Sequence, residues 1–513
     1  MNTPIKTIGS IAVCSLMVLS GLRPTQAQQA PLSTQTTAGN FVDSATAPPG
    51  FTQYLPTKRM APAIAVDRLD LGPVLPRPAR VDAATDYRDF RGEVGYVEEV
   101  APGLFSQPNW TKNADGSLTW SVELASTGST ALRVRLRGKW GYDGLELRVY
   151  DPVSGNALGP YTRPVLDDNG DWWTTIILGE SIGLEFHQPA DGEKRPLPAL
   201  PELSAVAKHW SDVGGAPRGG VGCTHNDLLC SPAWVDEGEA VCSYSYVENG
   251  STFVCTGALI NRSPSDLSPL LLTADHCIDS QVTAATVACF WFFQNDACDG
   301  SPPANNNGFP QTNGSIVLKT RNNSDVSLLG LVEPPAANLW LGWDAGGWLL
   351  QSDATGIHHP QGTFKRISFG DVTSAIFVTY GQNDTHVWRV GWDSGSTEGG
   401  SSGSPVLDTS GRIRGQLKGG DCDTGDYGRL GVSYDTLEPY IFNMASPVYV
   451  QSGAGGSQLG TSGDPFDTVY EATFCVFAGD EVRIRSANYN ERFTIWRPMT
   501  LNAENGLVRI GQP

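Results

Sequence analysis

A serine lies among small residues in the last third of the chain. Thr397–Pro405 has the sequence Thr-Glu-Gly-Gly-Ser-Ser-Gly-Ser-Pro, so Ser402 has glycines close on both sides. Glycine lets a backbone turn tightly and approach a substrate closely. Such a loop can expose a serine hydroxyl and leave backbone N–H groups pointing at one spot, which a nucleophile with an oxyanion hole requires. The stretch alone also matches an ordinary Gly/Ser turn, so a base and an orienting acid must come from elsewhere.

A histidine and an aspartate upstream have the surroundings that such a base and acid need. His276 ends an apolar strand and stands beside Cys277. Cys255 lies on the preceding apolar strand, and a disulfide between the two cysteines would pin the loop that carries the histidine. Asp325 comes directly before another apolar run, where it can be buried and directed inward. The chain order is therefore His276, Asp325, Ser402.

These segments resemble the trypsin/chymotrypsin clan of serine proteases and, more narrowly, the bacterial lysyl endopeptidases. The patterns Thr-Ala-x-His-Cys, Ser-Asp-Val-x-Leu-Leu and Gly-Ser-Ser-Gly-Ser-Pro occur in the clan's order. Further matches are Gly219–Cys223, Ile357–Pro360, Phe377–Tyr380, Gln416–Gly420 and Asp426–Arg429. The resemblance covers residues 219–445. It implies an endopeptidase that hydrolyses proteins through an acyl-enzyme, after lysine first and arginine second.

The resemblance implies a role for each residue of the constellation. His276 would take the proton of Ser402 and later protonate the leaving amine, while Asp325 would hold the imidazole in the right tautomer. Backbone N–H groups of Gly400 and Ser402 would form the oxyanion hole. Animal trypsins carry an aspartate before the nucleophile, which pairs with the new N-terminus on activation, but here that position is Ser401. This matches the bacterial branch, in which a propeptide assists folding and is then removed.

The resemblance also implies a set of substrate-binding residues. Asp426 matches the aspartate that binds the substrate ammonium group, which would discriminate against apolar side chains; a surface salt bridge is its alternative role. Glu398 matches a second pocket carboxylate. Lys418, followed by Gly419, takes a position that can hold histidine in lysyl endopeptidases, beside an aromatic partner that corresponds to Tyr380. A lysine there could pair with Asp426, or favour acidic residues near the cleaved bond.

Eight of the ten cysteines lie between residues 223 and 422, which suits an oxidising compartment. The disulfides that the resemblance implies are Cys223–Cys422, Cys230–Cys298 and Cys255–Cys277. Cys242 and Cys289 remain, on apolar strands, and could form a further bridge. A zinc site built from thiols with His358 and His359 is the alternative, but the thiols are dispersed, so we expect no metal and no cofactor. Cys475 is expected to be a buried free thiol.

Composition and charge narrow the class of protein. Among 513 residues only 17% are charged, and 58 glycines and 35 prolines favour a secreted, turn-rich β protein. The net charge of −19 argues against nucleic acid and anionic membranes as partners. Residues 1–27 are typical of a signal peptide, with Lys6 before the apolar run Ile8–Leu19, and no later stretch could span a bilayer. We expect a secreted monomer whose partners are protein or peptide substrates and its own propeptide.

The predicted fold is all-β and follows the domain order of a secreted zymogen. Residues 28–218 are predicted as a propeptide, disordered to about residue 50, with a β-sandwich over 86–187 and a linker over 188–218 that is cut after Arg218. Residues 219–445 are predicted as a two-barrel trypsin-like domain. Residues 446–513 are predicted as a small β-rich unit that weakly resembles the first coil of a pectin-lyase-like parallel β-helix. The sandwich strands are expected at Ser117–Leu124, Ala131–Leu136, Leu145–Tyr150 and Trp173–Leu178, and the C-terminal unit's helix within Pro465–Phe477.

A non-enzymatic function is the alternative. The chain would then be a secreted carbohydrate- or protein-binding protein with an inactive protease-like domain. Under that hypothesis Ser402→Ala would leave function intact, whereas in an enzyme it would abolish hydrolysis and self-processing.

Overall fold

The structure is a computed structural model. The residues that it describes are 36–37, 57–59, 66–76, 91–138, 144–162, 164, 167, 169–190, 197–210, 223–263, 266–301, 306–380, 383–442, 446–491, 493, 495 and 497–511. The predicted signal peptide, most of the segment 28–50 and the predicted cleavage point after residue 218 lie outside these ranges.

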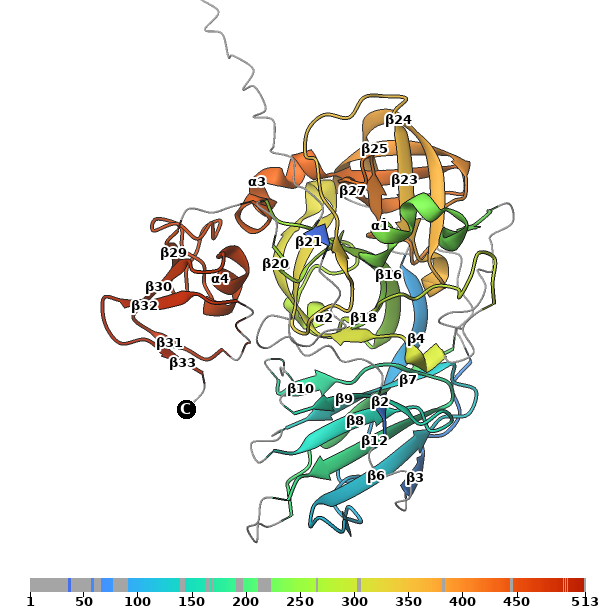
Figure 1. Ribbon diagram of the computed structural model, residues 1–513, viewed down its shortest axis with the longest axis vertical. Coiled ribbons are helices and arrows are strands. Elements are labelled where there is room, and N and C mark those ends of the chain that lie inside the picture. The colour runs from blue at the N-terminus through green and yellow to red at the C-terminus, as the bar shows by residue number, and fades with distance from the viewer. Residues whose placement is uncertain are drawn as a thin grey trace, which may run out of the picture.

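An N-terminal β domain forms the lower body in Figure 1, and two stacked sheets enclose its core. The first sheet contains β2 (Thr57–Lys58), β3 (Val66–Asp70), β5 (Thr111–Lys112), β6 (Leu118–Ala125), β8 (Glu146–Tyr150), β9 (Asn156–Tyr161) and β12 (Ser181–Gln188). The second contains β4 (Gly92–Glu99), β7 (Ala131–Arg137), β10 (Asp171–Trp173), β11 (Ile177–Leu178) and β13 (Glu202–His209). Alternating apolar residues such as Trp120, Val122, Val134 and Phe186 point inward and fill the space between the sheets.

Two local expectations for this domain are wrong. The segment 188–218 is not a continuous linker, because β13 pairs with both β4 and β7 inside the second sheet. The alternation of apolar residues in β13 is short and follows a proline-rich stretch, so the sequence pattern did not predict this strand. The predicted strand Trp173–Leu178 is broken into β10 and β11, because its register against β7 shifts by one residue between Trp173, opposite Arg135, and Ile177, opposite Leu132.

The second sheet continues into the protease domain. β4 pairs antiparallel with β16 (Ser251–Leu259), so one twelve-stranded sheet runs from the N-terminal domain into the first barrel (Figure 1). Buried side chains from both parts, including Ile176, Phe290, Phe293 and Phe364, form a shared apolar cluster. The N-terminal domain is therefore packed against the protease domain by backbone hydrogen bonds and apolar contact together.

The protease domain consists of two β-barrels. Besides β16, the first contains β15 (Val241–Glu248), β17 (Leu270–Ala274), β18 (Ala288–Phe290), β19 (Gln311–Asn313), β20 (Ser315–Arg321) and β21 (Val326–Leu331). The second contains β14 (Asn226–Asp227), β23 (Asp353–His358), β24 (Arg366–Tyr380), β25 (Asn383–Ser394), β26 (Pro405–Leu407), β27 (Ile413–Gly420) and β28 (Thr424–Arg429). Since β24 also pairs with β25, the second sheet closes on itself. The all-β, two-barrel expectation is confirmed.

Short helices and one small strand pair accompany the barrel strands. The α-helices are α1 (Val235–Glu239), α2 (Gln281–Ala284) and α3 (Leu430–Ile441), and the 3-10 turns are η2 (Leu228–Cys230), η3 (Pro232–Trp234), η4 (Asn306–Gly308), η5 (Asn322–Ser324) and η6 (Pro360–Gly362). The small pair joins β1 (Thr36–Thr37) to β22 (Leu339–Trp340). Among the described residues, no helix is both long and apolar enough to cross a membrane.

A small C-terminal unit lies beside the first barrel. It contains β29 (Val448–Val450), α4 (Val469–Cys475), β30 (Glu481–Arg485), β31 (Asn488–Tyr489), β32 (Thr500–Glu504) and β33 (Arg509–Ile510), and its strands pair in parallel. Thr468 caps α4 by accepting a hydrogen bond from the N–H of Glu471. Cys475 is a buried free thiol, as expected. The barrel's Arg262, itself fully buried, donates to the carbonyls of Cys475 and Val476 at 2.6 and 3.1 Å.

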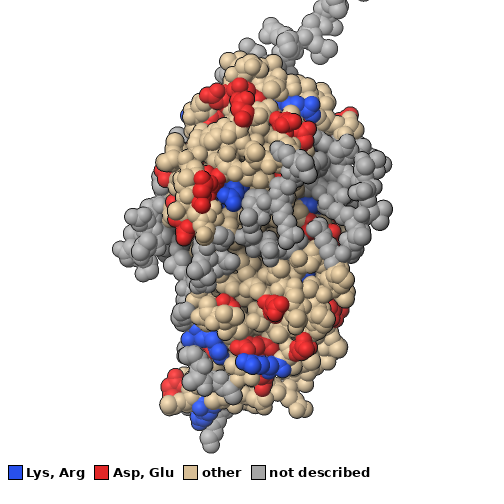
Figure 2. Space-filling view, turned by 90° about the vertical axis from the view of Figure 1, so that its right-hand side faces the viewer, with Lys and Arg blue, Asp and Glu red and all other residues tan. Residues whose placement is uncertain are grey.

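The charged side chains are spread over the surface. On the face that Figure 2 shows, acidic and basic groups are interspersed, and the basic ones form no continuous patch.

Candidate active site

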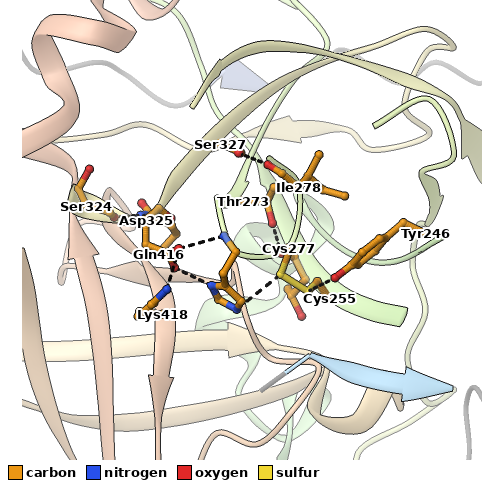
Figure 3. A network of polar contacts seen from close by, with 12 residues as sticks. Tyr246, Cys255, Thr273, Cys277, Ile278, Ser324, Asp325, Ser327, Gln416 and Lys418 are labelled. Atoms are coloured by element: carbon orange, nitrogen blue, oxygen red, sulfur yellow. Dashed lines mark hydrogen bonds and ion pairs between the residues drawn. A yellow bond between two sulfur atoms is a disulfide. The ribbon is translucent and has the colours of Figure 1, made fainter. Parts of the chain in front are cut away.

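His276 and Asp325 meet at the end of the first barrel (Figure 3). Nδ1 of His276 lies 2.7 Å from Oδ2 of Asp325, and the backbone N–H of His276 donates to Oδ1 at 3.0 Å. The histidine follows β17 directly, and the Cys255–Cys277 disulfide fastens its loop to β16. These two contacts fix the backbone and the imidazole of His276 against one carboxylate, so that Nδ1 is the protonated nitrogen. Nε2, the nitrogen that can act as a base, lies 3.8 Å from Sγ of Cys277.

The Asp325 backbone is held in an unusual conformation. It follows η5 with φ 53° and ψ 41°, in the left-handed region that aspartate enters more readily than most residues. The side-chain amide of Gln416 on β27 donates to the carbonyls of Ser324 and Asp325, at 2.6 and 3.0 Å. These bonds direct the carboxylate toward His276 instead of into the following strand, β21. Burial would raise the pKa of Asp325, but His276 and Lys418 outweigh it and hold this pKa below its usual value.

Ser402 lies in the loop between β25 and β26. Its carbonyl accepts a hydrogen bond of 2.8 Å from the N–H of Thr256, the residue after Cys255. Gly403 has φ +82°, and a Cβ there would lie 2.1 Å from Oγ1 of Thr273, so only glycine fits between the serine loop and the first barrel. The serine loop is thus bonded next to the cysteine whose disulfide also anchors His276.

The residue before Ser402 is held by a buried histidine. Oγ of Ser401 lies 2.8 Å from Nδ1 of His358, whose Nε2 lies 3.0 Å from Oγ of Ser368. Burial first, and then the neighbouring His225, lower the pKa of His358 well below its usual value. His358 is therefore neutral and bridges two hydroxyl groups, so Ser401 is held without an ion pair.

The predicted pocket carboxylate Glu398 is engaged within the protein. Its Oε2 lies 2.9 Å from Nε2 of His225 and accepts from the side-chain amide of Gln361 at 3.0 Å. The hydroxyl of Ser396 also donates to the carbonyl of Thr224 at 2.7 Å. The segment after Cys223 is therefore tied to the loop that leads to the nucleophile.

The other predicted carboxylate, Asp426, is not open to a substrate cation in this structure. Arg389, its cross-strand neighbour on β25, binds both of its oxygens at 2.7 Å. Successive side chains on a strand point to opposite faces, so Asp426 faces away from Gly425 and Tyr427, which lie beside Trp392. The alternative role, a structural salt bridge, describes this contact better.

Lys418 is also placed differently from the expected pairing. Its Nζ lies 3.1 Å from Oδ1 of Asp325, not beside Asp426 (Figure 3). Gly419 lies opposite Asp426 in the β27–β28 register. Tyr380 ends β24 at the tip of a long hairpin, and its side chain lies outside the described part.

The cysteines form the three implied bridges but not the possible fourth. The structure joins Cys223 to Cys422, Cys230 to Cys298 and Cys255 to Cys277. Cys242 and Cys289 are buried free thiols instead of a fourth bridge. They lie on the paired strands β15 and β18, where Cys289 stands opposite Tyr244 and is only diagonal to Cys242. Burial and the contact with Cys242 raise the pKa of Cys289 well above its usual value, which keeps this thiol protonated.

Four contacting residues were not singled out in the sequence: His225, Gln361, Arg389 and Gln416. Each acts on a partner far away in the chain, and no spacing rule links them to it. Gln416 alone had a signal, because it opens the matched segment Gln416–Gly420.

Two β-barrels with an Asp–His pair and a glycine-flanked serine between them define a trypsin-like serine endopeptidase. Residues 219–432 match the lysyl endopeptidase C-terminal domain family. A lysyl endopeptidase of Pseudomonas aeruginosa is 30% identical over 324 residues, which cover 61% of this chain and 70% of that protein. The chain belongs to the lysyl endopeptidase family.

Solved structures with lower similarity were also found. The active form of the Rv3671c protease from M. tuberculosis is 19% identical with a TM-score of 0.31, covering 46% of this chain and 95% of that one. The MamO protease domain from Magnetospirillum magneticum is 14% identical with a TM-score of 0.29, covering 40% and 98%.

Proposed function

We propose that this serine endopeptidase cleaves peptide bonds with Ser402 as nucleophile, His276 as general base and Asp325 as the orienting acid. The observation that carries the proposal is the 2.7 Å contact between Nδ1 of His276 and Asp325, on a disulfide-anchored loop close to Ser402, whose carbonyl accepts from the N–H of Thr256. Burial first lowers the pKa of His276, while Asp325 opposes this effect. The imidazole is thus unprotonated at neutral pH and ready to accept the hydroxyl proton.

The reaction proceeds in two steps. Ser402 attacks the carbonyl carbon as its proton passes to Nε2 of His276, which then protonates the leaving amine. Water attacks the acyl-enzyme in the same way and releases the acid product. Backbone N–H groups of Gly400 and Ser402 stabilise the oxyanion, and the positive φ of Gly400, +92°, turns the peptide as such a loop requires. Loss of one such donor costs about 3 kcal/mol of transition-state stabilisation.

Cleavage after lysine, with arginine second, is the proposed specificity. Its support is membership of the lysyl endopeptidase family and the similarity to the Pseudomonas relative, which is itself a lysyl endopeptidase. The Asp426 carboxylate carries this specificity only if a substrate cation displaces Arg389, whose side chain is 37% exposed at the edge of the pair.

Residues 28–218 are proposed to be a propeptide of a secreted zymogen, removed after Arg218, with residues 1–27 as its signal peptide. In support, β4 occupies the edge of β16 beside the serine loop: a Cβ on Gly92 would lie 2.7 Å from Val254 and 3.7 Å from the N of Gly400. Arg91 forms an ion pair with Glu248 and lies over the ring of Phe253, 4.6 Å from its centre. An extended polypeptide in this position obstructs the approach of substrate to the oxyanion loop.

A covalent probe tests the proposed nucleophile. The purified protein is incubated with a serine-directed phosphonylating inhibitor, and the modified peptide is located by mass spectrometry. We expect modification at Ser402, none in Ser402→Ala, and a mature enzyme that begins near Gly219. Absence of labelling in the processed wild type would overturn the assignment, and retention of function by Ser402→Ala would favour the binding-protein alternative. A peptide library then measures the preference at the cleaved residue, where dominance of Phe, Glu or Ala would contradict lysine specificity.

A further inference from the structure

Lys418 contacts the aspartate of the proposed constellation from the second barrel. Its ammonium nitrogen lies 3.1 Å from Oδ1 of Asp325, and their side chains are only 11% and 2% exposed. The same oxygen accepts the N–H of His276, while the second oxygen contacts the imidazole. In Figure 3 the amino group of Lys418 points at the Asp325 carboxylate, which His276 also contacts. The ion pair therefore belongs to the site and not to the solvent-exposed surface.

We propose that Lys418 is a positioning residue for this reaction: its ammonium group fixes the Asp325 carboxylate and shares its negative charge, so that His276 stays an unprotonated base in more acidic solution. This inference rests on the proposed function and assigns Lys418 a role in it other than binding substrate.

The charges that face His276 come from four segments. Asp325 favours the protonated imidazole, and burial opposes it most strongly, followed by Lys418 and by Arg91, which adjoins β4. Asp275 and Asp279 stand on the histidine's own loop. Burial, Asp325 and Asp279 raise the pKa of Asp275 to about 7, so this acid carries little charge below neutrality. In the described part of the protease domain, Lys418 is thus the cation that contacts Asp325, and it would remain after the proposed removal of residues 28–218.

The ion pair between Lys418 and Asp325 changes how strongly Asp325 stabilises the protonated form of His276. A carboxylate that serves both an ammonium and an imidazole stabilises the imidazolium less than one that serves the imidazole alone. Lys418 therefore makes His276 a weaker base, and this keeps the imidazole unprotonated, and the enzyme active, at lower pH. Its hydrogen bond also keeps Oδ2 turned toward Nδ1 of His276, since Oδ1 is held from two sides.

The rate of inhibitor labelling tests this role without involving the substrate pocket. The second-order rate constant for phosphonylation of Ser402 is measured from pH 4 to 10 in the processed wild type, Lys418→Met and Lys418→Arg. We expect the acidic limb of Lys418→Met to move to higher pH, and that of Lys418→Arg to stay near the wild type. Lys319→Met is the matched control, because it also removes one partly buried lysine, which lies 3.5 Å from Glu471 away from the site. Its limb should not move.

Each outcome separates this inference from the proposed function. An acidic limb that is unchanged in Lys418→Met, with altered substrate preference instead, would overturn the positioning role and return Lys418 to the pocket. Failure of the wild type to react at all would overturn the proposed function. If Lys418→Met does not fold, Lys418→Gln in the full-length Ser402→Ala chain replaces it. The NMR signal of the proton between His276 and Asp325 is then titrated, and an unshifted midpoint would contradict the inference.

Discussion

Oγ of Ser401 and Nδ1 of His358 lie 2.8 Å apart, fully buried beneath the nucleophile loop. In animal trypsins an aspartate at the position of Ser401 completes this loop by pairing with a new N-terminus. Here the neutral imidazole of His358 binds Ser401 instead. The conformation of the nucleophile loop therefore does not depend on an ion pair at Ser401. The adjacent Glu398 is in turn bound by His225, a few residues after the proposed new N-terminus.

Replacing His358 should therefore damage catalysis more than its distance from the reacting atoms suggests. His358→Ala removes the imidazole that holds the buried Ser401 hydroxyl and leaves it only the longer contact of 3.3 Å from the N–H of Glu398, at a cost of about 1–3 kcal/mol. We expect kcat to fall about tenfold to a hundredfold with little change in KM, as the oxyanion loop loses its shape. His386→Ala is the control, because His386 stacks on the exposed Phe377 of the β24–β25 hairpin. Equal losses in both variants would contradict a specific role for His358.

The Asp426–Arg389 pair should prove structural. Asp426→Asn leaves the guanidinium of Arg389 with a weaker partner, and we expect a loss of about 1–3 kcal/mol in the free energy of unfolding. The kcat/KM ratio between lysine and apolar substrates should change less than threefold. If Asp426 instead binds the substrate cation, Asp426→Asn will abolish lysine preference, and Arg389→Gln will improve KM for lysine peptides. Denaturant melts and a matched pair of peptides separate the two cases.

Stability should fall as the pH rises toward neutrality because of Asp275. Burial, and then Asp325 and Asp279, raise the pKa of Asp275 from 3.8 to about 7. The folded protein thus holds a proton that the unfolded chain releases, so this contribution is complete below about pH 4 and is lost by about pH 7. Asp275→Asn should remove that slope and stabilise the protein at pH 8 by on the order of 4 kcal/mol. Urea unfolding at pH 5 and pH 8 measures this, with Asp353→Asn on the exposed start of β23 as control.

The C-terminal unit should remain attached through Arg262. This fully buried guanidinium donates to two carbonyls at the end of α4 and contacts Asp266 at 3.1 Å. Arg262→Leu removes the donor to the Cys475 carbonyl, whereas the Val476 carbonyl still accepts from Arg497 at 3.0 Å, and we expect a cost of about 1–3 kcal/mol. Limited proteolysis should then release the unit beyond residue 445 faster than in the wild type. Arg483→Leu, which breaks an exposed pair with Glu481, should leave both the melting temperature and the cleavage rate unchanged.

Local sequence determined the chemistry and the fold class of this protein. A histidine at a strand end beside a cysteine, an aspartate before an apolar run and a serine between glycines are short-range features. Each depends on a few neighbouring residues, so their types and order already indicate what they can do. The strands of the barrels are equally local, because alternation and turn residues lie within about ten positions.

Only the tertiary structure decided which charges meet. Lys418 binds Asp325 instead of Asp426, and Asp426 binds Arg389, because strand register and the alternation of side chains set which face each one occupies. The continuation of the N-terminal sheet through β4 into β16 likewise depends on two edges that are separate in the chain. A one-residue change of register would turn each of these side chains to the opposite face, and residue spacing along the sequence does not contain that information.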